Sequence, residues 1–256
     1  MPAREHFPPT RFSHASQLLT ISLISHQQGD IAQHLLDGLA AMDSHLLKVI
    51  VTLNVPEDWE PVWYHQTAAL VVVRNPQPKG FGANHNAAFA RCDTPFFAML
   101  NPDLDLDGLQ LANLLRCFDD PMLALVSPTV LTPQGERADI ERDRMSLPNL
   151  LRRRLHRPPG PTAWIAGVCL FLRAEAFRDV GGFDERYFMY CEDADLCGRL
   201  VLAGWRFAVD PTVRIVHDAR RRSLRSPRHF VYHLHSLLRY WCSSAFWAQG
   251  RQASCR

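Results

Sequence analysis

Two apolar runs separated by a helical segment constrain the fold of this chain more than any other feature. Residues 18–25 (LLTISLIS) and 46–53 (LLKVIVTL) are rich in β-branched and aliphatic side chains, as buried strands are. Residues 30–42, between them, carry apolar side chains at helical spacing. Strand, helix and strand at this spacing predict a βαβ unit, whose ligand crevice lies beyond the carboxyl ends of its parallel strands.

Further apolar runs continue the α/β pattern. We expect a mixed, mostly parallel central sheet flanked by helices, because buried runs of strand length alternate with segments of helical period. The segment 132–161 is polar, rich in Arg and interrupted by Pro and Gly, so we interpret it as a mobile loop that orders over bound ligand. The predicted strands are 70–74, 96–100, 124–130, 163–173 and a strand pair in 207–217, and the predicted helices are 109–118 and 228–247.

Composition restricts the class of protein. The 256 residues suit one large α/β domain, and 47% hydrophobic with 21% charged residues is an ordinary globular balance. No apolar run approaches the ~20 residues that cross a bilayer, and the first 17 residues lack the apolar core of a signal peptide. We therefore expect a cytoplasmic protein. Seven cysteines without metal-site spacing predict free thiols.

The charge is unevenly distributed. A net charge of +2 does not suggest nucleic acid as a partner. Basic side chains nevertheless gather at 152–157 and 220–228. A solvated surface and attraction to anionic lipid head groups or to a diphosphate are both open interpretations of these clusters.

The segment 181–204 (GGFDERYFMYCEDADLCGRLVLAG) concentrates the candidate chemistry. Its second half has helical periodicity, and Gly204 ends the helix. Glu192 and Asp193 then fall at or just before the first turn, behind four apolar and aromatic residues. Such carboxylates cap helices, and they also serve as general bases when they emerge from an apolar wall. The residues alone leave both roles open.

A second candidate site follows the predicted strand 96–100. Asp103, in Asn101-Pro102-Asp103, stands at the carboxyl end of this buried strand. Mg2+ takes one or two protein carboxylates together with substrate phosphate oxygens, so this placement suits a divalent cation. The loop 75–86 (NPQPKGFGANHN) adds glycines that let the backbone approach a ligand, followed by a helix that we expect to begin near residue 84.

These motifs together resemble a known family. GGFDE, YF and EDADL, preceded by GVCLFLR and followed by His217, occur in order with NPQPKGFGANHNAAF and FFAMLNPDLDLD. This combination resembles the inverting family 2 glycosyltransferases of the GT-A fold, in particular their bacterial rhamnosyltransferase-like branch. The matching parts span most of residues 18–217.

The resemblance implies a metal-dependent enzyme of bacterial cell-surface polysaccharide or lipopolysaccharide synthesis. Its donor would be a nucleotide-diphospho-sugar, with rhamnose a candidate sugar. Its acceptor would be a hydroxyl of a saccharide or lipid-linked saccharide. A nucleotidyltransferase is an alternative, although SHQQGD after the first strand lacks the Gly-rich, Arg/Lys-bearing loop that this reading predicts. A catalytically silent partner in a polysaccharide-assembly complex is another.

The resemblance also assigns roles to individual residues. Asp193 would be the base and Glu192 would orient acceptor or base, while Asp103 and His217 would hold Mg2+ or Mn2+. Two departures from the family pattern are TLNVPED, where an Asp-containing turn is common, and NPD in place of DxD. The substrate-binding candidates are His26 and Asn54 for the nucleoside, Lys79, Gly82 and Asn86 for the donor, Asn101 as a neutral oxygen or hydrogen-bonding group beside Asp103, and Trp164 and Gly167 for the acceptor side. The residues alone also allow Asn54 and Gly82 to be turn residues, Asn86 a helix cap, Lys79 a solvated side chain, and Trp164 and Gly167 parts of a core strand.

We expect three regions along the chain. Residues 1–17 form an irregular tail, residues 18–220 the catalytic domain, and residues 221–256 a helical extension. The apolar face predicted for the extension fits packing on the domain, a homodimer contact or a peripheral membrane surface.

Overall fold

The computed structural model describes residues 17–42, 47–64, 69–218 and 227–252. Four features of the sequence analysis lie outside the described residues. They are the predicted tail up to residue 16, the first residue of the predicted strand 46–53, the basic cluster up to residue 225 and the boundary at residue 220.

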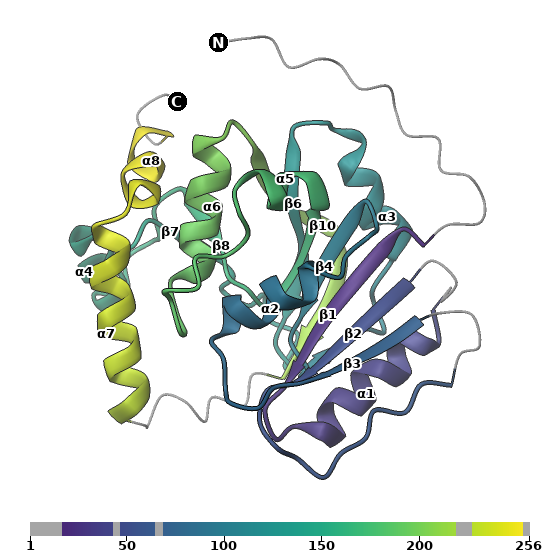
Figure 1. Ribbon diagram of the computed structural model, residues 1–256. Coiled ribbons are helices and arrows are strands. Elements are labelled where there is room, and N and C mark those ends of the chain that lie inside the picture. Colours follow the sequence, from purple (N-terminus) through teal and green to yellow (C-terminus); the bar gives the residue numbers. More distant parts are fainter. Residues whose placement is uncertain (1–16, 43–46, 65–68, 219–226, 253–256) are drawn as a thin grey trace.

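A central sheet of eight strands organises the described chain (Figure 1). β1 pairs in parallel with β2 on one side and with β4 on the other, and β2 pairs in parallel with β3. β9 runs antiparallel between β4 and β6, and β10 runs parallel to β6. The sheet order is β3 (Ala69–Arg74), β2 (Leu47–Leu53), β1 (Leu19–Ser25), β4 (Phe96–Leu100), β9 (Cys169–Arg173), β6 (Leu123–Leu131), β10 (Arg206–His217) and β5 (Leu104–Asp105).

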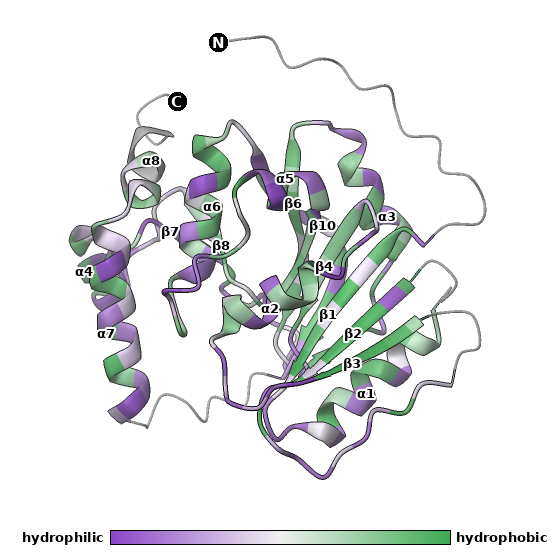
Figure 2. Cartoon of the chain, viewed as in Figure 1, coloured by the Kyte–Doolittle hydropathy of each residue, from purple (hydrophilic) through white to green (hydrophobic). Residues whose placement is uncertain are grey.

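The central strands are buried because their sequences are largely apolar, and buried polar side chains such as Thr20 and Ser22 have hydrogen-bond partners. Every residue of β4 is buried, as is nearly all of β1 and β2, and these strands are mostly hydrophobic in Figure 2, apart from polar positions such as Lys48 of β2. Helices cover the sheet, as parallel strands require. They are α1 (Gly29–Ala40), α2 (Phe81–Phe89), α3 (Leu111–Arg116) with the 3₁₀ turn η2 (Cys117–Asp119), α5 (Ala174–Asp179) and α6 (Glu192–Leu202).

A cluster of phenylalanines joins α2 to the segment that precedes α6. The ring of Phe177 lies 4.8 Å from Phe89 and 5.6 Å from Phe183, centroid to centroid, both in edge-to-face geometry. Phe97 of β4 stacks on Phe177 at 5.8 Å. Burying each ring contributes roughly 1.5–3 kcal/mol, so this cluster holds the GGFDE segment against the sheet.

Two predicted elements differ substantially from the structure. The predicted mobile loop 132–161 contains β7 (Glu141–Asp143) and α4 (Leu147–Arg154). The predicted strand 163–173 is two strands, β8 (Thr162–Ile165) and β9, which belong to different sheets. They separate because the residues between them turn across the end of β4, where the backbone N–H of Asn101 donates to the carbonyl of Val168.

The remaining differences are smaller. Residues 207–217 form one long strand with a register shift between Asp210 and Arg214, instead of a strand pair. The helix expected to begin near residue 84 begins at Phe81. The predicted helix 228–247 is divided into α7 (Pro227–Trp241) and α8 (Ser244–Gln252). A turn at Ser243 separates these helices, since its hydroxyl accepts the N–H of Phe246.

Both C-terminal helices contact the body of the domain. The methyl group of Ala245 on α8 lies against Gly198 of α6, where a side chain would clash. On α7, the hydroxyl of Ser236 donates to the carbonyl of Met189 at 2.8 Å. Figure 1 shows α4, α7 and α8 together at the edge of the molecule opposite α1 and β3. No helix in the described part of the chain is both long and apolar enough to cross a bilayer.

Candidate active site

The carboxyl ends of β1, β2, β3 and β4 share one edge of the sheet, because these four strands are parallel. The chain order reverses between β1 and β4, and α/β sheets bind ligands at such a switch point. A cavity of about 680 Å³ opens at this edge. It is lined by Gln27, Gly29 and Asp30 after β1, by Leu53 and Val55 to Trp59 at and after β2, and by Arg74 and Asn75 at β3.

Asn54 lies behind this cavity and supports its wall. Its Oδ1 accepts the backbone N–H of Lys79 at 2.8 Å and the side-chain amide of Asn75 at 2.9 Å, and its Nδ2 donates to the carbonyl of Lys79 at 3.0 Å. Asn75 also donates to Oδ1 of Asn84. This buried amide network ties the turn after β2 to the loop before α2. The Asn54 side chain is therefore committed to protein contacts.

His26 and Lys79 stand at the same edge with exposed side chains. The ring Nδ1 of His26 lies 3.3 Å from Nδ2 of Asn54. Both side chains are close to the ligand edge, and neither is among the residues that line the cavity.

Gly82 and Asn86 hold α2 against the segment 181–188. A Cβ on Gly82 would meet Cβ of Phe183 at 2.6 Å, so only glycine permits this approach. The amide of Asn86 accepts the N–H of Phe183 at 2.9 Å and donates to Glu185 at 3.0 Å. These contacts place the GGFDE segment beside α2.

Asp103 and His217 come together across 114 positions of sequence. Nε2 of His217 lies 3.0 Å from Oδ1 of Asp103, and both side chains are largely buried. The backbone supports the pair, since the N–H of Asp218 donates to the carbonyl of Asp103. One carboxylate and one imidazole suit a divalent cation that also takes diphosphate oxygens. No cluster of three or more potential metal ligands occurs among the described residues.

A strained turn delivers the acids at the start of α6. Tyr190 and Cys191 have φ of 72° and 64°, in the left-handed region that non-glycine residues rarely adopt. Such strain persists where surrounding contacts impose it, and it concentrates at functional sites. The hydroxyl of Tyr190 contacts Nδ1 of His229 on α7 at 2.8 Å. Glu192 and Asp193 then occupy the first two helical positions.

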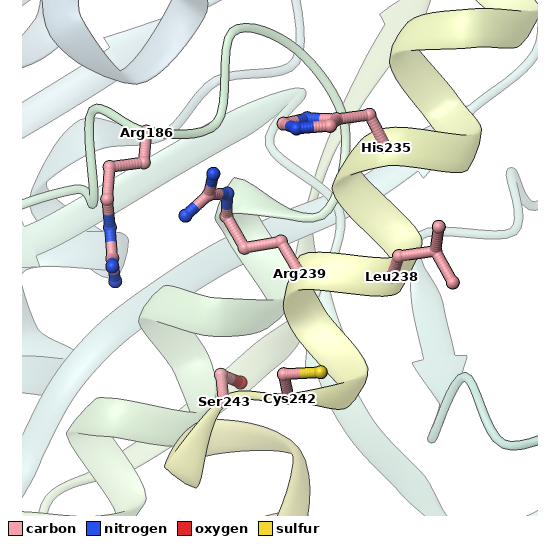
Figure 3. Close-up of a pocket in the computed structure, with 6 residues that line it drawn as sticks. All are labelled: Arg186, His235, Leu238, Arg239, Cys242 and Ser243. Carbon is pink, nitrogen blue, oxygen red and sulfur yellow. The ribbon is translucent and has the colours of Figure 1, made fainter.

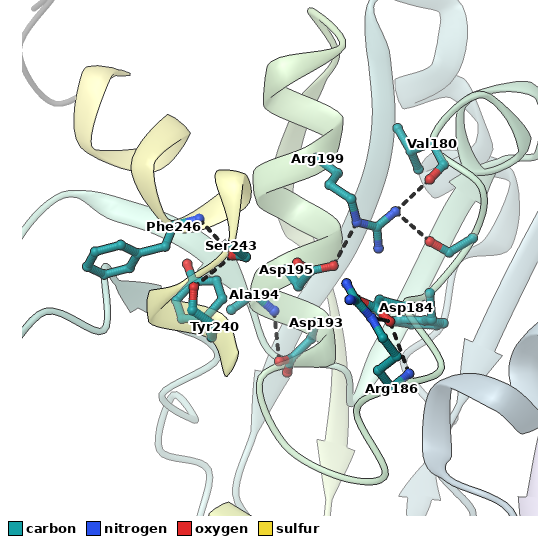
Figure 4. Close-up of polar contacts among 12 residues, drawn as sticks. Val180, Asp184, Arg186, Asp193, Ala194, Asp195, Arg199, Tyr240, Ser243 and Phe246 are labelled. Carbon is teal, nitrogen blue, oxygen red and sulfur yellow. Dashed lines mark hydrogen bonds and ion pairs between the residues drawn. The ribbon is translucent and has the colours of Figure 1, made fainter. Parts of the chain in front are cut away.

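The carboxylate of Asp193 is held at both oxygens. The backbone N–H of Gly167 donates to Oδ2 at 3.0 Å and that of Ala194 to Oδ1 at 2.8 Å, the latter drawn in Figure 4. Burial raises the pKa of Asp193 above its usual value, and the two backbone donors oppose this shift. These donors fix the orientation of the carboxylate while burial makes it a better proton acceptor.

Glu192 is buried more completely. Burial, together with the charge of Asp193, raises the pKa of Glu192 well above its usual value. Its Oε2 has no hydrogen-bond partner among the described residues. A buried, unpaired carboxylate oxygen is costly, which favours the neutral form of this side chain.

The third acid of this helix has a structural role. Nε of Arg199 lies 2.7 Å from Oδ2 of Asp195, one turn away, as the spacing of these residues predicts. The same guanidinium donates to the carbonyls of Val180 and Gly182 (Figure 4). Asp195 therefore anchors the 180–182 turn to α6.

The turn between β8 and β9 connects the two candidate centres. The carbonyl of Val168 accepts the N–H of Asn101 at 3.0 Å, and the adjacent Gly167 donates its N–H to Asp193. The NPD turn and the acids of α6 therefore lie on either side of one three-residue turn. Trp164 stands before this turn, with its indole N–H bonded to the carbonyl of Asp143 at 2.9 Å.

Arg142 is a site residue that the sequence analysis missed. It lies on β7 opposite Trp164, and its positive charge lowers the pKa of Asp193 against the effect of burial. Burial lowers the pKa of Arg142 itself, and its Nε has no partner among the described residues. The sequence analysis missed Arg142 because 132–161 was interpreted as a loop, and its relation to Asp193 depends on the pairing of β7 with β8.

The architecture and the position of the acids define a GT-A glycosyltransferase fold, and comparison of structures agrees. A mannosyltransferase, PcManGT from Pyrobaculum calidifontis in complex with GDP-Man and Mn2+, superposes with a TM-score of 0.62 at 18% identity, covering 92% of this chain and 73% of that one. TarS residues 1–349 of S. aureus, in complex with UDP, superposes with a TM-score of 0.57 at 16% identity, covering 86% and 64%. The GT-A fold expected from the sequence is confirmed.

The chain belongs to glycosyl transferase family 2, whose model matches residues 34–181. The rhamnosyltransferase WbbL of Escherichia coli K12 is 29% identical over 246 residues, covering 87% of this chain and 92% of that protein. The pre-mycofactocin glycosyltransferase of Mycobacterium tuberculosis is 36% identical over 152 residues, which cover 58% of this chain. The match takes up only 32% of that relative's length. The resemblance to this family inferred from the motifs is confirmed.

Proposed function

We propose that this chain transfers a sugar, with inversion, from a nucleotide-diphospho-sugar to an acceptor hydroxyl. The observation that carries the proposal is the hydrogen-bonded turn between β8 and β9. Through Val168 and Gly167 it brings the end of β4, which leads to Asp103, beside the carboxylate of Asp193. In this proposal Asp103 would bind the diphosphate of the donor, and Asp193 would act as the general base on the acceptor in the same site.

The cavity at the ends of β1, β2 and β3 is the proposed nucleoside site. Its carboxylates, Asp30, Glu57 and Asp58, can accept hydrogen bonds from a base N–H or from ribose hydroxyls. The hydroxyl of Ser25 fixes Glu57 by donating to its Oε2 at 2.8 Å, and the other oxygen of Glu57 has no partner among the described residues. In this proposal Asn54 shapes the wall, while His26 and Lys79 stand at the rim.

Asp103 and His217 are the proposed ligands of Mg2+ or Mn2+. Their donor atoms already face each other at 3.0 Å, and a donor diphosphate would complete a ligand set of which the protein supplies two members. When bound, the cation would neutralise charge that develops on the departing nucleoside diphosphate. Asn101, two positions before Asp103, is proposed to offer a neutral oxygen or a hydrogen bond.

Asp193 is the proposed base. As the acceptor oxygen attacks the anomeric carbon, the bond to the diphosphate breaks and Asp193 takes the acceptor proton. The N–H groups of Gly167 and Ala194 hold the carboxylate so that no reorientation is needed during the reaction. Glu192, kept neutral by burial, is proposed to donate a hydrogen bond that positions the acceptor or the base, and Trp164 to border the acceptor.

We propose rhamnose as the first donor sugar to test and a lipid-linked saccharide as the acceptor class. WbbL carries the description rhamnosyltransferase, and its match extends over nearly the whole of both chains. A second relative, 46% identical over 74 residues, is described as an N-acetylglucosaminyl-diphospho-decaprenol L-rhamnosyltransferase of Mycobacterium tuberculosis. Membership of the family argues against the nucleotidyltransferase alternative.

Thermal denaturation with dTDP-rhamnose, UDP-GlcNAc and GDP-mannose, each with and without Mn2+, tests the proposal. A donor present at 100 times its dissociation constant should stabilise the protein by about 2.7 kcal/mol. The preferred donor should also be hydrolysed slowly, with release of nucleoside diphosphate. A catalytically silent partner would bind the donor without hydrolysing it, and no stabilisation by any donor would contradict the proposed site.

A further inference from the structure

Two helices at one edge of the molecule expose large apolar side chains in rows. On α4 and directly after it these are Leu147, Leu151 and Leu155, which recur every four residues and are 55–67% exposed. On α7 they are Phe230, Val231, Leu234 and Leu238, which are 48–70% exposed. Single exposed apolar residues are ordinary, but rows of them on neighbouring helices indicate a surface that contacts something apolar.

The row on α4 is bordered by positive charge. At 100° per residue, Arg152 and Arg154 fall on either side of the leucine row, and both are exposed. Arg153 points the opposite way and ties α4 to the domain, with its Nε 3.0 Å from Asp143. The sequence has no Asp or Glu from residue 144 to residue 174. The outward face of α4 is therefore purely apolar and basic.

The row on α7 lies on the outer side of that helix. Ser236 and Tyr240, on the inner side, are buried against the domain. Trp241 donates its indole N–H to the carbonyl of Met145 at 2.7 Å, which joins the end of α7 to the segment leading into α4. No Asp or Glu follows Asp218 in the sequence, so α7 also lacks acids.

A basic pocket borders the α7 row. It has a volume of about 390 Å³ and is lined by Arg186, His235, Leu238, Arg239, Cys242 and Ser243 (Figure 3). Leu238 belongs to both the row and the pocket. Arg239 lies beside the ring of Tyr187, and its buried Nε has no partner among the described residues. Both guanidinium groups are drawn on the same side of α7 in Figure 3.

We propose that these two rows and their arginines form one docking face for the surface of an anionic lipid bilayer. Apolar side chains in such a face enter the boundary between head groups and acyl chains, while Arg152 and Arg154, which flank the α4 row, contact lipid phosphates. A second copy of the chain fits less well, because self-association would bring arginine against arginine with no acid on either helix. The inference concerns lipid binding and does not depend on the proposed transferase reaction.

The docking face also has a defined relation to the candidate site. α7 contacts the strained turn before α6 through Tyr190 and His229, and through Ser236 and the carbonyl of Met189. Binding at the outer side of α7 would therefore place the acids of α6 close to the bilayer surface.

Vesicle co-sedimentation of the full chain tests the proposal. We expect binding to vesicles of phosphatidylcholine with about a third phosphatidylglycerol, weaker binding in high salt, and little binding to phosphatidylcholine alone. Replacing both Arg152 and Arg154 by Gln should weaken binding about 25-fold, since each basic side chain near an anionic membrane contributes about fivefold. Replacing Leu147 and Leu151 by Ser should weaken binding in both low and high salt.

Matched controls come from the rest of the surface. Arg116→Gln with Arg178→Gln removes the same charge, and Leu202→Ser removes an exposed leucine of α6; none of these should alter vesicle binding. Equal binding to neutral and anionic vesicles, or no binding to either, would overturn the proposal. So would a dimer in sedimentation velocity, without lipid, that the Leu147 and Leu151 substitutions dissociate. Donor-induced stabilisation is measured on the same variants, so that failure of the lipid-binding proposal can be distinguished from failure of the proposed function.

Discussion

Replacing Asp193 by Asn removes the proposed base while keeping the size of the side chain. The carboxylate accepts one backbone N–H at each oxygen, from Gly167 at 3.0 Å and from Ala194 at 2.8 Å. An amide can satisfy only one of them, because its NH₂ would face the other N–H. The lost hydrogen bond should cost about 1–3 kcal/mol. Removing a buried charge, whose pKa burial raises, offsets part of this cost.

The kinetic effect should be much larger than the effect on folding. Losing a positioned base reduces turnover by roughly 10² to 10⁴, equivalent to about 2.7–5.4 kcal/mol in the activation barrier. In the wild type, activity should fall on acidification at a pH above the usual pKa of an aspartate, because Asp193 must be ionised to accept a proton. That acid limb should disappear in the Asn variant.

The assay is release of nucleoside diphosphate as a function of pH, with melting temperature and donor-induced stabilisation measured on the same preparations. Glu185→Gln is the matched control, because it neutralises an exposed acid of the same segment and retains an acceptor for Asn86. We expect near wild-type turnover for this control. A folded Asp193→Asn protein that retains more than about a tenth of wild-type turnover would refute the assignment.

Three further predictions concern the metal, the buried acid and the packing of α2. Asp103→Ala and His217→Ala should each abolish Mn2+-dependent stabilisation by the donor, measured by thermal denaturation with EDTA as the reference; unchanged stabilisation would argue against a metal at this pair. Glu192→Gln should raise the melting temperature at pH 8 and have little effect near pH 4. The sign follows because the pKa of Glu192 is higher in the folded state than in the unfolded state. Such a carboxyl group destabilises the native state at pH values above the raised pKa, and it does not do so at pH values below the pKa of the unfolded state. A larger gain at pH 4 than at pH 8 would contradict this. Gly82→Ala should destabilise the fold by about 1–3 kcal/mol, because the new Cβ would overlap Phe183, and urea denaturation would show it.

The strands around the switch point were predictable within one residue from the sequence. Residues 70–74 and 96–100 correspond to β3 and β4, and the described parts of 18–25 and 46–53 correspond to β1 and β2. These segments are largely apolar and rich in β-branched residues, so the same residues favour both burial and strand formation. The Asp195–Arg199 pair was predictable for a similar reason, since helical spacing determines which side chains meet.

The interruption at residues 166–168 was not predictable. The run 163–173 is apolar up to Arg173, as a single buried strand would be. It divides because Gly167 donates to Asp193, 26 positions away, and Val168 accepts from Asn101. Neither contact has a local signature. Arg142 was missed for the same reason, because its relation to Asp193 exists only once β7 pairs with β8.

The sequence by itself determined the α/β pattern, the family and the residue types available for chemistry, because these depend on composition, periodicity and motifs read along the chain. Only the tertiary structure decided that Asp103 meets His217, that Asn54 supports a wall, and that the apolar rows of α4 and α7 share one edge of the molecule. The physical reason is that the periodicity of apolar residues along a segment indicates whether that segment is buried. Which residues it contacts depends on how distant segments of the chain pack and pair with one another.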